Sequence, residues 1–260
     1  MDLGLRGKTA LITGGSKGIG LATAILLAAE GAQIAIAARN EEQLHAASAI
    51  IHEQTGVEPL IISTDVSSQE QCERAVALTA ERFGRLDILV NNAGTSAAKP
   101  FEEVSTEGWL SDLDLKLFGA VHCARAALPH MRKSGSGAIV NVTAVAGKTP
   151  SASSLPTSVS RAAGLALTKA MSKDLAADDI RVNAVCIGLI RSDQIEKAWQ
   201  ASSPDSTWEQ FSTDPKHGIP LRRIGRTEEA ANVIAFLVSE AASYVTGTSV
   251  NIDGGISAVL

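Results

Sequence analysis

Short apolar runs alternate along the chain with longer segments in which polar residues interrupt the apolar ones. The short runs are expected to form buried strands, and the longer segments are expected to form helices. Helices are predicted to end near residues 30 and 54 and to span about 68–83, 107–131, 157–177 and 227–238. Strands are predicted at 9–12, 33–38, 60–63, 88–90, 138–142, 180–185 and 249–252.

This alternation predicts βαβ units, whose right-handed crossovers build a parallel sheet with helices on both faces. The 260 residues are enough for one large domain of this kind, and no linker-like stretch divides them. The predicted fold class is therefore α/β, a single domain over residues 1–260 with a Rossmann-like, doubly wound parallel sheet. Between about 190 and 218 a polar segment with Trp199, Trp208 and Phe211 breaks the pattern and is expected to form a lid.

Composition and hydropathy bear on whether the protein binds nucleic acid, a membrane or a metal. The formal net charge is −5 and aromatic residues make up 3% of the chain, so we expect no nucleic-acid partner. No apolar run is long enough to span a membrane, and the first residues have no apolar signal-peptide core. We therefore expect a cytoplasmic protein without a membrane partner. Cys72, Cys123 and Cys186 are scattered and odd in number, which favours reduced thiols and no structural metal.

A glycine-rich turn, TGGSKGIG at 13–20, joins the first predicted strand to the first predicted helix. Gly14, Gly18 and Gly20 would let the backbone turn tightly and approach a pyrophosphate, and the N-terminus of the helix would attract its negative charge. Such a turn alone is equally compatible with a simple strand-to-helix connection. It predicts a dinucleotide phosphate site only together with the motifs that follow.

Those motifs occur in a fixed order along the chain. They are Asp65–Val66, NNAG at 91–94, IRVNAV at 180–185, YVTG at 244–247 and DGG at 253–255. With them, essentially the whole chain resembles the short-chain dehydrogenase/reductase family, whose members transfer hydride between a nicotinamide cofactor and an alcohol or carbonyl compound. The resemblance implies an oxidoreductase that binds a dinucleotide.

The resemblance also implies which residues hold that cofactor. The positions at the phosphates, the adenine and the adenosine ribose all look intact. The loop after the strand at 180–185 has lost the family's Pro but keeps its Gly. The implied residues are Gly14, Ser16, Gly18, Ile19 and Gly20 at the pyrophosphate, Asp65 and Val66 at the adenine, Asn91, Ala93 and Gly94 at the adenosine ribose, Arg161 at a ribose hydroxyl, and Gly188, Ile190 and Ser192 in the loop that receives the nicotinamide.

The end of the second predicted strand bears on the choice between NAD and NADP. Relatives that prefer NAD carry an acid there, which binds the ribose 2′-hydroxyl, whereas this chain has Ala38 followed by Arg39. Lys17 adds a second cation on the same side, and two cations suit a 2′-phosphate. We therefore predict NADP(H) over NAD(H), the alternative being a solvated Lys17 and an exposed Arg39.

All four positions that carry catalysis in the family are changed. A threonine hydroxyl has no ionisation comparable to that of a phenol, so the residue at the family's Tyr position is expected to be a poor proton donor. Reduction by the family's usual mechanism is therefore expected to be weak. The resemblance places Ala144 at the family's Ser, Thr157 at its Tyr, Arg161 at its Lys and Lys116 at its Asn.

Lys116 is the strongest candidate to take over part of this chemistry. Its ammonium is expected either to reach the space vacated by the Tyr and Lys, or to form a structural ion pair with Asp112 or Asp114. Ser158 and Ser160 flank Thr157 but should face around the helix, so neither is expected to replace the phenol.

Other candidates have plain structural alternatives. Ser96 and Ser153, with Ser151 and Ser154, lie in segments that border the substrate in the family, so with Ala144 they would line its pocket; they are equally turn formers. Cys186 is a possible thiol nucleophile, but a small buried core residue is favoured. His217 near the lid is the one histidine to test for catalysis.

The leading prediction is an NADP(H)-binding oxidoreductase of this family that acts on a small alcohol or carbonyl compound through a non-standard active centre. One alternative is a catalytically silent protein that binds the nucleotide or another ligand. The other is a non-redox lyase or hydrolase that uses the old substrate pocket. The resemblance implies a homotetramer, with a dimer as the alternative, assembled through the helices at 107–131 and 157–177 and the C-terminal segment.

Overall fold

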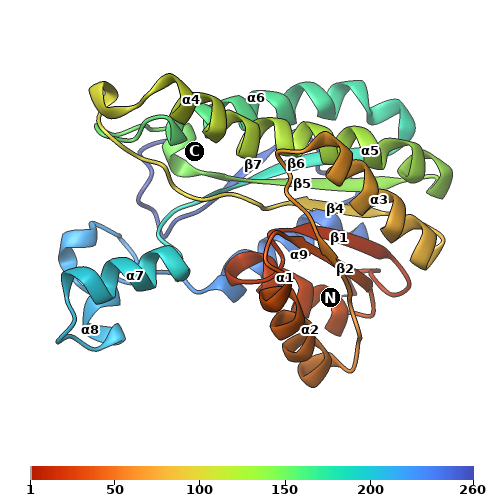
Figure 1. Ribbon diagram of the computed structural model, residues 1–260, viewed down its shortest axis with the longest axis horizontal. Helices are drawn as coiled ribbons and strands as arrows, with labels where there is room; N and C mark the ends of the chain where they lie inside the picture. The colour runs from red at the N-terminus through yellow and green to blue at the C-terminus, as the bar shows by residue number, and fades with distance from the viewer. Residues whose placement is uncertain (1) are drawn as a thin grey trace.

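The computed structural model describes residues 2–260 and contains one seven-stranded sheet (Figure 1). All paired strands are parallel, in the order β3-β2-β1-β4-β5-β6-β7. The chain runs from β1 to one edge of the sheet and then from β4 to the other, so the predicted doubly wound fold is confirmed. The strands are β1 (Thr9–Thr13), β2 (Gln33–Ala38), β3 (Leu60–Ser63), β4 (Ile88–Asn91), β5 (Gly137–Ala144), β6 (Ile180–Ile187) and β7 (Ser249–Ile252).

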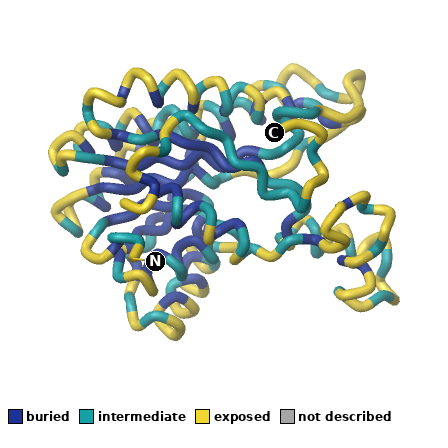
Figure 2. The backbone as a smooth tube through the Cα atoms, turned by 180° about the vertical axis from the view of Figure 1, so that it is seen from behind, coloured by how far each residue is buried: buried dark blue, intermediate teal, exposed yellow. Residues whose placement is uncertain are grey.

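Helices cover both faces of the sheet (Figure 1). On one face, α1 (Gly18–Ala29) contacts both α2 (Glu41–Thr55) and α9 (Thr227–Val238). One apolar cluster lies under each layer of helices, and the central strands between the layers are largely buried, whereas the edge strands β3 and β7 are partly exposed (Figure 2). The sheet is therefore covered on both sides, as parallel sheets require. The other face carries α3 (Gln69–Phe83), α4 (Thr106–Leu113), α5 (Gly119–Ser134) and α6 (Thr157–Asp174).

The ends of several helices follow from local sequence. Asn40, Ser68 and Ser105 are the N-caps of α2, α3 and α4, and each side chain accepts a hydrogen bond from a backbone N–H in the first turn. Gly56 and Gly84 terminate α2 and α3 at φ of 73° and 77°, a left-handed conformation that suits glycine. The predicted ends of α2 and α3 accordingly lie within a residue of the observed ones.

The single long helix predicted at 107–131 is wrong. The segment consists of α4, a π-helical turn at Asp114–Phe118 and α5. In that turn the N–H of Gly119 donates to the carbonyl of Asp114, five residues earlier. An apolar repeat does not distinguish this wider turn from a regular one, and π turns are frequent at functional sites. Lys116 lies within the turn.

The segment at about 190–218, predicted as a polar lid, contains two short helices. These are α7 (Asp193–Ser202) and α8 (Trp208–Ser212), which stand apart from the helices that flank the sheet (Figure 1). Trp199 and Trp208 pack edge to face, with ring centroids 5.6 Å apart. The segment is built around a small apolar cluster of Phe211, Ile219 and Ile224 with Leu189, Ile195, Trp199 and Trp208.

Within residues 2–260, no helix combines the length and the apolar character needed to cross a membrane. Over the same range, no three His, Cys, Asp or Glu side chains are grouped so that they could hold a metal ion. Cys72, Cys123 and Cys186 are buried free thiols.

Candidate functional site

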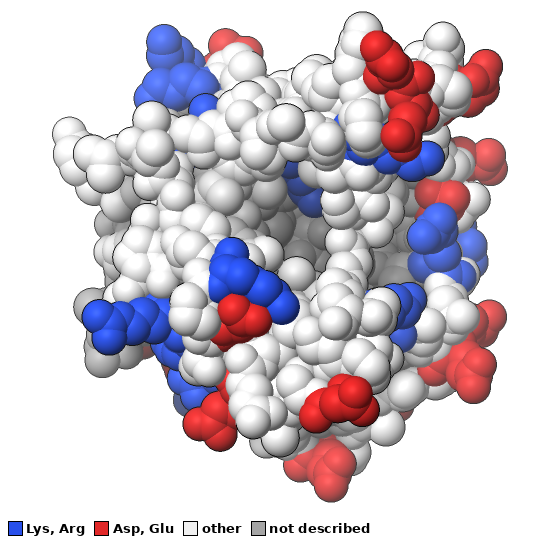
Figure 3. Space-filling view, turned by 90° about the vertical axis from the view of Figure 1, so that its left-hand side faces the viewer, with Lys and Arg blue, Asp and Glu red and all other residues white. Residues whose placement is uncertain are grey.

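A cleft lies at the carboxyl ends of the central strands. Seen from the side that carries α7 and α8, the molecule is hollowed at its centre, and a basic side chain is visible deep in the hollow (Figure 3). The loops that follow β1, β2, β3 and β4 enclose a cavity of about 200 Å³. In doubly wound sheets this edge is where ligands bind. The cavity is lined by Gly14, Ser16, Ala37, Ala38, Arg39, Asn40, Gln43, Thr64, Asp65, Val66, Ala93, Gly94, Thr95 and Leu115.

The glycine-rich turn has the shape of a phosphate-binding loop. Gly14 and Gly18 have φ of 63° and 54°, which few other residues adopt. A Cβ at Gly20 would lie 2.3 Å from the carbonyl oxygen of Gly14, so only glycine lets α1 begin this close to the turn. The N-terminus of α1 therefore faces the cleft with its free N–H groups, which favours an anion. Ser16 lines the cavity, and Ile19 packs against the core.

The expected adenine and ribose residues, apart from Asn91, line the same cavity. Asp65 and Val66 lie in its wall, and hydrogen bonds from Ser67 lower the pKa of the Asp65 carboxyl. Asn91 points elsewhere: its Nδ2 donates to Asn141 Oδ1 at 2.9 Å, and its buried Oδ1 has no partner within residues 2–260. The backbone of Ala93 and Gly94 therefore borders the cavity without the Asn91 side chain.

Lys17 and Arg39, the two cations expected at a 2′-phosphate, are separated in the structure. Arg39 lines the cavity beside Asn40 and Gln43, which sequence reasoning missed. Lys17 Nζ instead forms an ion pair of 2.8 Å with Asp193 Oδ2 at the start of α7. Arg39 is thus the cation placed at the cavity, while Lys17 contacts the lid segment.

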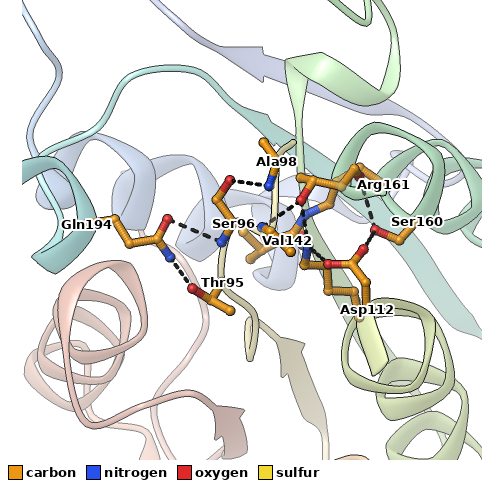
Figure 4. A network of polar contacts seen from close by, with 11 residues as sticks. Thr95, Ser96, Ala98, Asp112, Val142, Ser160, Arg161 and Gln194 are labelled. Carbon is orange, nitrogen blue, oxygen red and sulfur yellow. Dashed lines mark hydrogen bonds and ion pairs between the residues drawn. The ribbon is translucent and has the colours of Figure 1, made fainter. Parts of the chain in front are cut away.

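Two of the altered catalytic positions, Lys116 and Thr157, lie in a buried polar network with Asp112 and Ser160. Lys116 Nζ forms an ion pair with Asp112 Oδ1 and donates to Thr157 Oγ1 at 3.0 Å. The side chains of Lys116 and Asp112 are 1% and 2% exposed. Both expectations for Lys116 hold at once: it reaches the space beside Thr157, and it pairs with Asp112. Asp112 Oδ2 in turn accepts from Ser160 Oγ at 2.6 Å (Figure 4).

The Thr157 hydroxyl is held with its hydrogen free. Oγ1 accepts from Lys116 Nζ at 3.0 Å and from the backbone N–H of Ala97 at 2.9 Å. A hydroxyl has two acceptor lone pairs and one hydrogen, so these two bonds leave the hydrogen directed elsewhere. Within residues 2–260 no acceptor is hydrogen-bonded to it. The Thr157 hydroxyl can therefore donate a hydrogen bond to a ligand.

Backbone pairing keeps the Ala97 N–H in place. The N–H of Lys99 donates to the Leu155 carbonyl at 2.8 Å, and the N–H of Leu155 donates to the Lys99 carbonyl at 3.2 Å. These bonds join the loop that follows β4 to the loop that precedes α6. The two loops that carry Ala97 and Thr157 are therefore fixed relative to each other.

Arg161 is a second buried cation beside the network. Its Nη1 donates to the Val142 carbonyl at 2.6 Å, and its buried Nε has no partner within residues 2–260 (Figure 4). Burial lowers the pKa of the Arg161 guanidinium, but an arginine remains charged at any physiological pH. A Cβ at Gly94 would lie 2.9 Å from Arg161 Nη2, so the guanidinium lies directly beneath the loop after β4.

The charges around Lys116 oppose one another. Burial lowers the pKa of the Lys116 amine, the Asp112 carboxylate raises it, and the Arg161 charge lowers it. Two buried cations therefore lie near one carboxylate, and Lys116 alone of the two forms an ion pair with it. This arrangement favours a ligand atom that carries or develops negative charge.

The expected substrate-pocket residues do not all face one space. Ala144 ends β5, and Ser153 is exposed with φ of 56°. Ser154 is buried and donates to the Ser151 carbonyl at 2.6 Å, so it is a turn residue. The N–H of Ser96 donates to Gln194 Oε1 at 3.2 Å (Figure 4).

The residues of the loop after β6 have packing and helix-capping roles. A Cβ at Gly188 would lie 2.6 Å from the Asp253 side chain, which explains the glycine. Ile190 is buried, and Ser192 is the N-cap of α7.

Two further candidates also have structural roles. His217 Nε2 lies 2.7 Å from the Phe211 carbonyl inside the lid segment, and Cys186 is a fully buried core residue, as favoured from the sequence.

Besides Asn40 and Gln43, sequence reasoning missed Ser160 and Gln194. Ser160 was set aside because it faces away from the phenol position, yet that direction brings it to Asp112. Gln194 lies in a segment without a regular pattern, and its Nε2 donates to Thr95 Oγ1 at 2.7 Å. The resemblance pointed to Thr157 and Lys116, and the four-residue spacing of Asp112 and Lys116 pointed to their ion pair.

Comparison with known proteins supports the interpretation of the cleft. Residues 14–257 match a family model described as enoyl-(acyl carrier protein) reductase. A 3-oxoacyl-[acyl-carrier-protein] reductase from Thermotoga maritima is 35% identical over 256 residues, covering 97% of this chain and 98% of the relative. An uncharacterized oxidoreductase from the same organism is 37% identical over 258 residues, covering 99% and 100%.

Solved structures give the same result. L-sorbose reductase from Gluconobacter frateurii, complexed with NADPH and L-sorbose, is 35% identical with a TM-score of 0.95 and full coverage of both chains. A short chain oxidoreductase from Pseudomonas aeruginosa PAO1, described as containing an atypical catalytic center, is 34% identical with a TM-score of 0.95, covering 99% of this chain and 100% of that one. From its motifs, its fold and these relatives, the chain belongs to the short-chain dehydrogenase/reductase family of oxidoreductases.

Proposed function

We propose that this protein is an NADP(H)-dependent oxidoreductase that reduces a small carbonyl compound, with Thr157 and Lys116 delivering the proton. The observation that carries the proposal is the Thr157 hydroxyl, whose lone pairs are taken by Lys116 and Ala97 and whose hydrogen is free. The similar L-sorbose reductase was solved with NADPH and L-sorbose. A polyhydroxy ketone is therefore the first substrate to test.

The cleft fits a dinucleotide phosphate. Gly14 and Gly20 bring the backbone and the start of α1 together, and Arg39 lines the adjoining cavity. The buried Nε of Arg161 is a donor without a partner within residues 2–260, suited to a ribose hydroxyl. NADPH, when bound, supplies the hydride.

Reduction adds a hydride to the carbonyl carbon and a proton to the carbonyl oxygen. As the C=O π bond breaks, its electron pair passes to the oxygen, which takes the free hydrogen of Thr157. Thr157 Oγ1 then takes a proton from Lys116 Nζ, which becomes a neutral amine. The excess of cations over carboxylates at Lys116, Arg161 and Asp112 stabilises the negative charge that develops on the oxygen.

The test is NADPH oxidation with a panel of small ketones that begins with L-sorbose. Turnover that depends on Thr157 is the expected result. Tight NADPH binding without turnover of any ketone would instead indicate a nucleotide-binding protein without catalysis. If neither NADPH nor NADH bound, a lyase or hydrolase reaction in the same pocket would become the leading hypothesis.

Replacing Arg39 with alanine should weaken NADPH binding about ten- to hundredfold and leave NADH binding nearly unchanged. The reason is the loss of one charge-assisted bond to the 2′-phosphate, about 1.5–3 kcal/mol. Fluorescence titration with both nucleotides measures the effect. Lys17→Ala is the matched control, because Lys17 pairs with Asp193 and should not discriminate between the nucleotides. A selective loss of NADPH in that control would contradict the assignment.

We also propose that residues 190–218 act as a lid, fastened across the cleft by the first residues of α7. Asp193 pairs with Lys17 on one side, and Gln194 bonds Thr95 and Ser96 on the other. Gln194→Ala removes both of its hydrogen bonds and should accelerate NADPH dissociation at least about fivefold, a net loss of about 1 kcal/mol or more. A stopped-flow chase with excess NADP⁺ measures this rate, and Glu196→Gln in the same helix is the control. If NADPH dissociated at the same rate from the wild type, Gln194→Ala and Glu196→Gln, the proposed lid would be wrong.

We propose a homotetramer, with a dimer as the alternative, that uses the helices around the site. Large apolar side chains are exposed there, with Leu110 at 57%, Phe118 at 45% and Val159 at 43%. Exposed apolar side chains gathered in one region often mark an interface. Sedimentation equilibrium would give the number of subunits. The cytoplasm stays the predicted location.

A further inference from the structure

Asp112 is a buried carboxylate with no direct part in the proposed reaction. It lies in α4 and is 4% exposed. One of its oxygens contacts Lys116 in the π turn, and the other accepts from Ser160 Oγ of α6 at 2.6 Å (Figure 4). Both oxygens therefore have a partner, and the partners come from two different elements. This fixes the carboxylate between the π turn and α6.

The Ser160 hydroxyl donates its hydrogen bond to Asp112 rather than to a carbonyl of its own helix. Its hydroxyl lies 2.6 Å from Asp112 Oδ2 and 3.0 Å from the Thr157 carbonyl. A hydroxyl has one hydrogen, and the ionised carboxylate is both the nearer and the stronger acceptor. The Ser160 hydrogen therefore points to Asp112 and restricts its rotation.

Few charged groups surround the Lys116 ammonium. Asp112 on α4 raises its pKa, and Arg161 on α6 lowers it. A cavity of about 20 Å³ adjoins Lys116; of the side chains lining it, those of Lys116 and Arg161 carry charge, and those from β4 and β5 are neutral. The buried Cys186 on β6 influences the pKa of Arg161 but not that of Lys116. Among these groups, Asp112 is the one that favours the charged form of the amine.

Resting on the proposed function, we propose that Asp112 is a positioning residue: oriented by Ser160, it keeps the Lys116 ammonium protonated and directed at Thr157. Without a carboxylate, a buried lysine beside an arginine sheds its proton readily. A neutral Lys116 could not return a proton to Thr157. Asp112 therefore sets the upper pH at which this centre can protonate a substrate.

The first test is the pH profile of NADPH-dependent reduction in the full-length Asp112→Asn protein. Activity should fall as pH rises through the pKa of Lys116, because the charged amine is the form that donates. Removing the carboxylate lowers that pKa, so the fall should begin about one to three pH units lower than in the wild type. Ser160→Ala should move it in the same direction by less. Asp114→Asn, an exposed acid two residues away in the chain, should not move it.

A second readout does not depend on turnover. The ¹³Cε resonance of Lys116, assigned by its absence from the Lys116→Met spectrum, reports protonation directly. Its titration midpoint should be lower in Asp112→Asn than in the wild type. Equal midpoints in the two proteins would overturn the role given to Asp112, whatever the activity. Full activity in Thr157→Val would instead overturn the proposed reaction, while the resonance would still decide the charge state that Asp112 imposes.

Discussion

Replacing Thr157 with valine is expected to lower kcat for carbonyl reduction about 100- to 10,000-fold, the range typical of a lost general acid. Valine keeps the shape of threonine but has no hydroxyl, so the free hydrogen directed away from Lys116 and Ala97 disappears. NADPH binding should change little, because the cavity that holds Arg39 does not include residue 157. Steady-state kinetics with nucleotide titration separate the two effects.

Two variants control this experiment. Thr157→Ser restores a hydroxyl and should recover most of the rate. Ser158→Ala removes the neighbouring buried hydroxyl, which lies 3.1 Å from Ser154 Oγ and does not contact Lys116, and should keep the wild-type rate. If Thr157→Val and Ser158→Ala behaved alike, the hydroxyl would be structural and the proposed proton donor would be wrong.

Replacing Lys116 with methionine is expected to lower the free energy of unfolding by about 3–5 kcal/mol at neutral pH, the usual effect of removing one partner of a buried ion pair. Asp112 would keep the Ser160 bond but lose its cation while almost fully buried. Urea denaturation followed by circular dichroism measures the loss.

The double variant Asp112→Leu with Lys116→Met tests the cause. It removes both charges, so most of the lost stability should return. In that variant Ser160 can donate to the Thr157 carbonyl, 3.0 Å away. Lys8→Met is the exposed control: its ion pair with Glu240 is partly solvated, with side chains 24% and 60% exposed, and should contribute at most about 1 kcal/mol. A double variant no more stable than Lys116→Met would show that the loss comes from packing.

Most of the fold could be predicted because each strand is a short, mostly apolar run with a clear turn or helix after it. β1, for example, is buried at every position. The π turn at Asp114–Phe118 could not, because one extra residue in a turn barely disturbs the apolar repeat. α7 and α8 were missed because they are short and bury their aromatic residues against each other rather than against the sheet.

The site was predictable where it depends on local spacing. The interval between Asp112 and Lys116 places them on one side of a helix, and the ion pair forms. The contacts of Ser160 with Asp112 and of Lys17 with Asp193 join residues distant in the chain, and only the folded chain reveals them. Lys17 shows the limit of such reasoning: its charge and position suggested a phosphate partner, whereas in the structure it pairs with the carboxylate of Asp193 in α7.

The buried Lys116–Asp112 pair also restricts how these positions can change during evolution. Exchanging either residue alone leaves the other as a buried charge without its direct partner, which is a severe loss of stability. Lineages that acquire a tyrosine-based centre should therefore have exchanged positions 112 and 116 together.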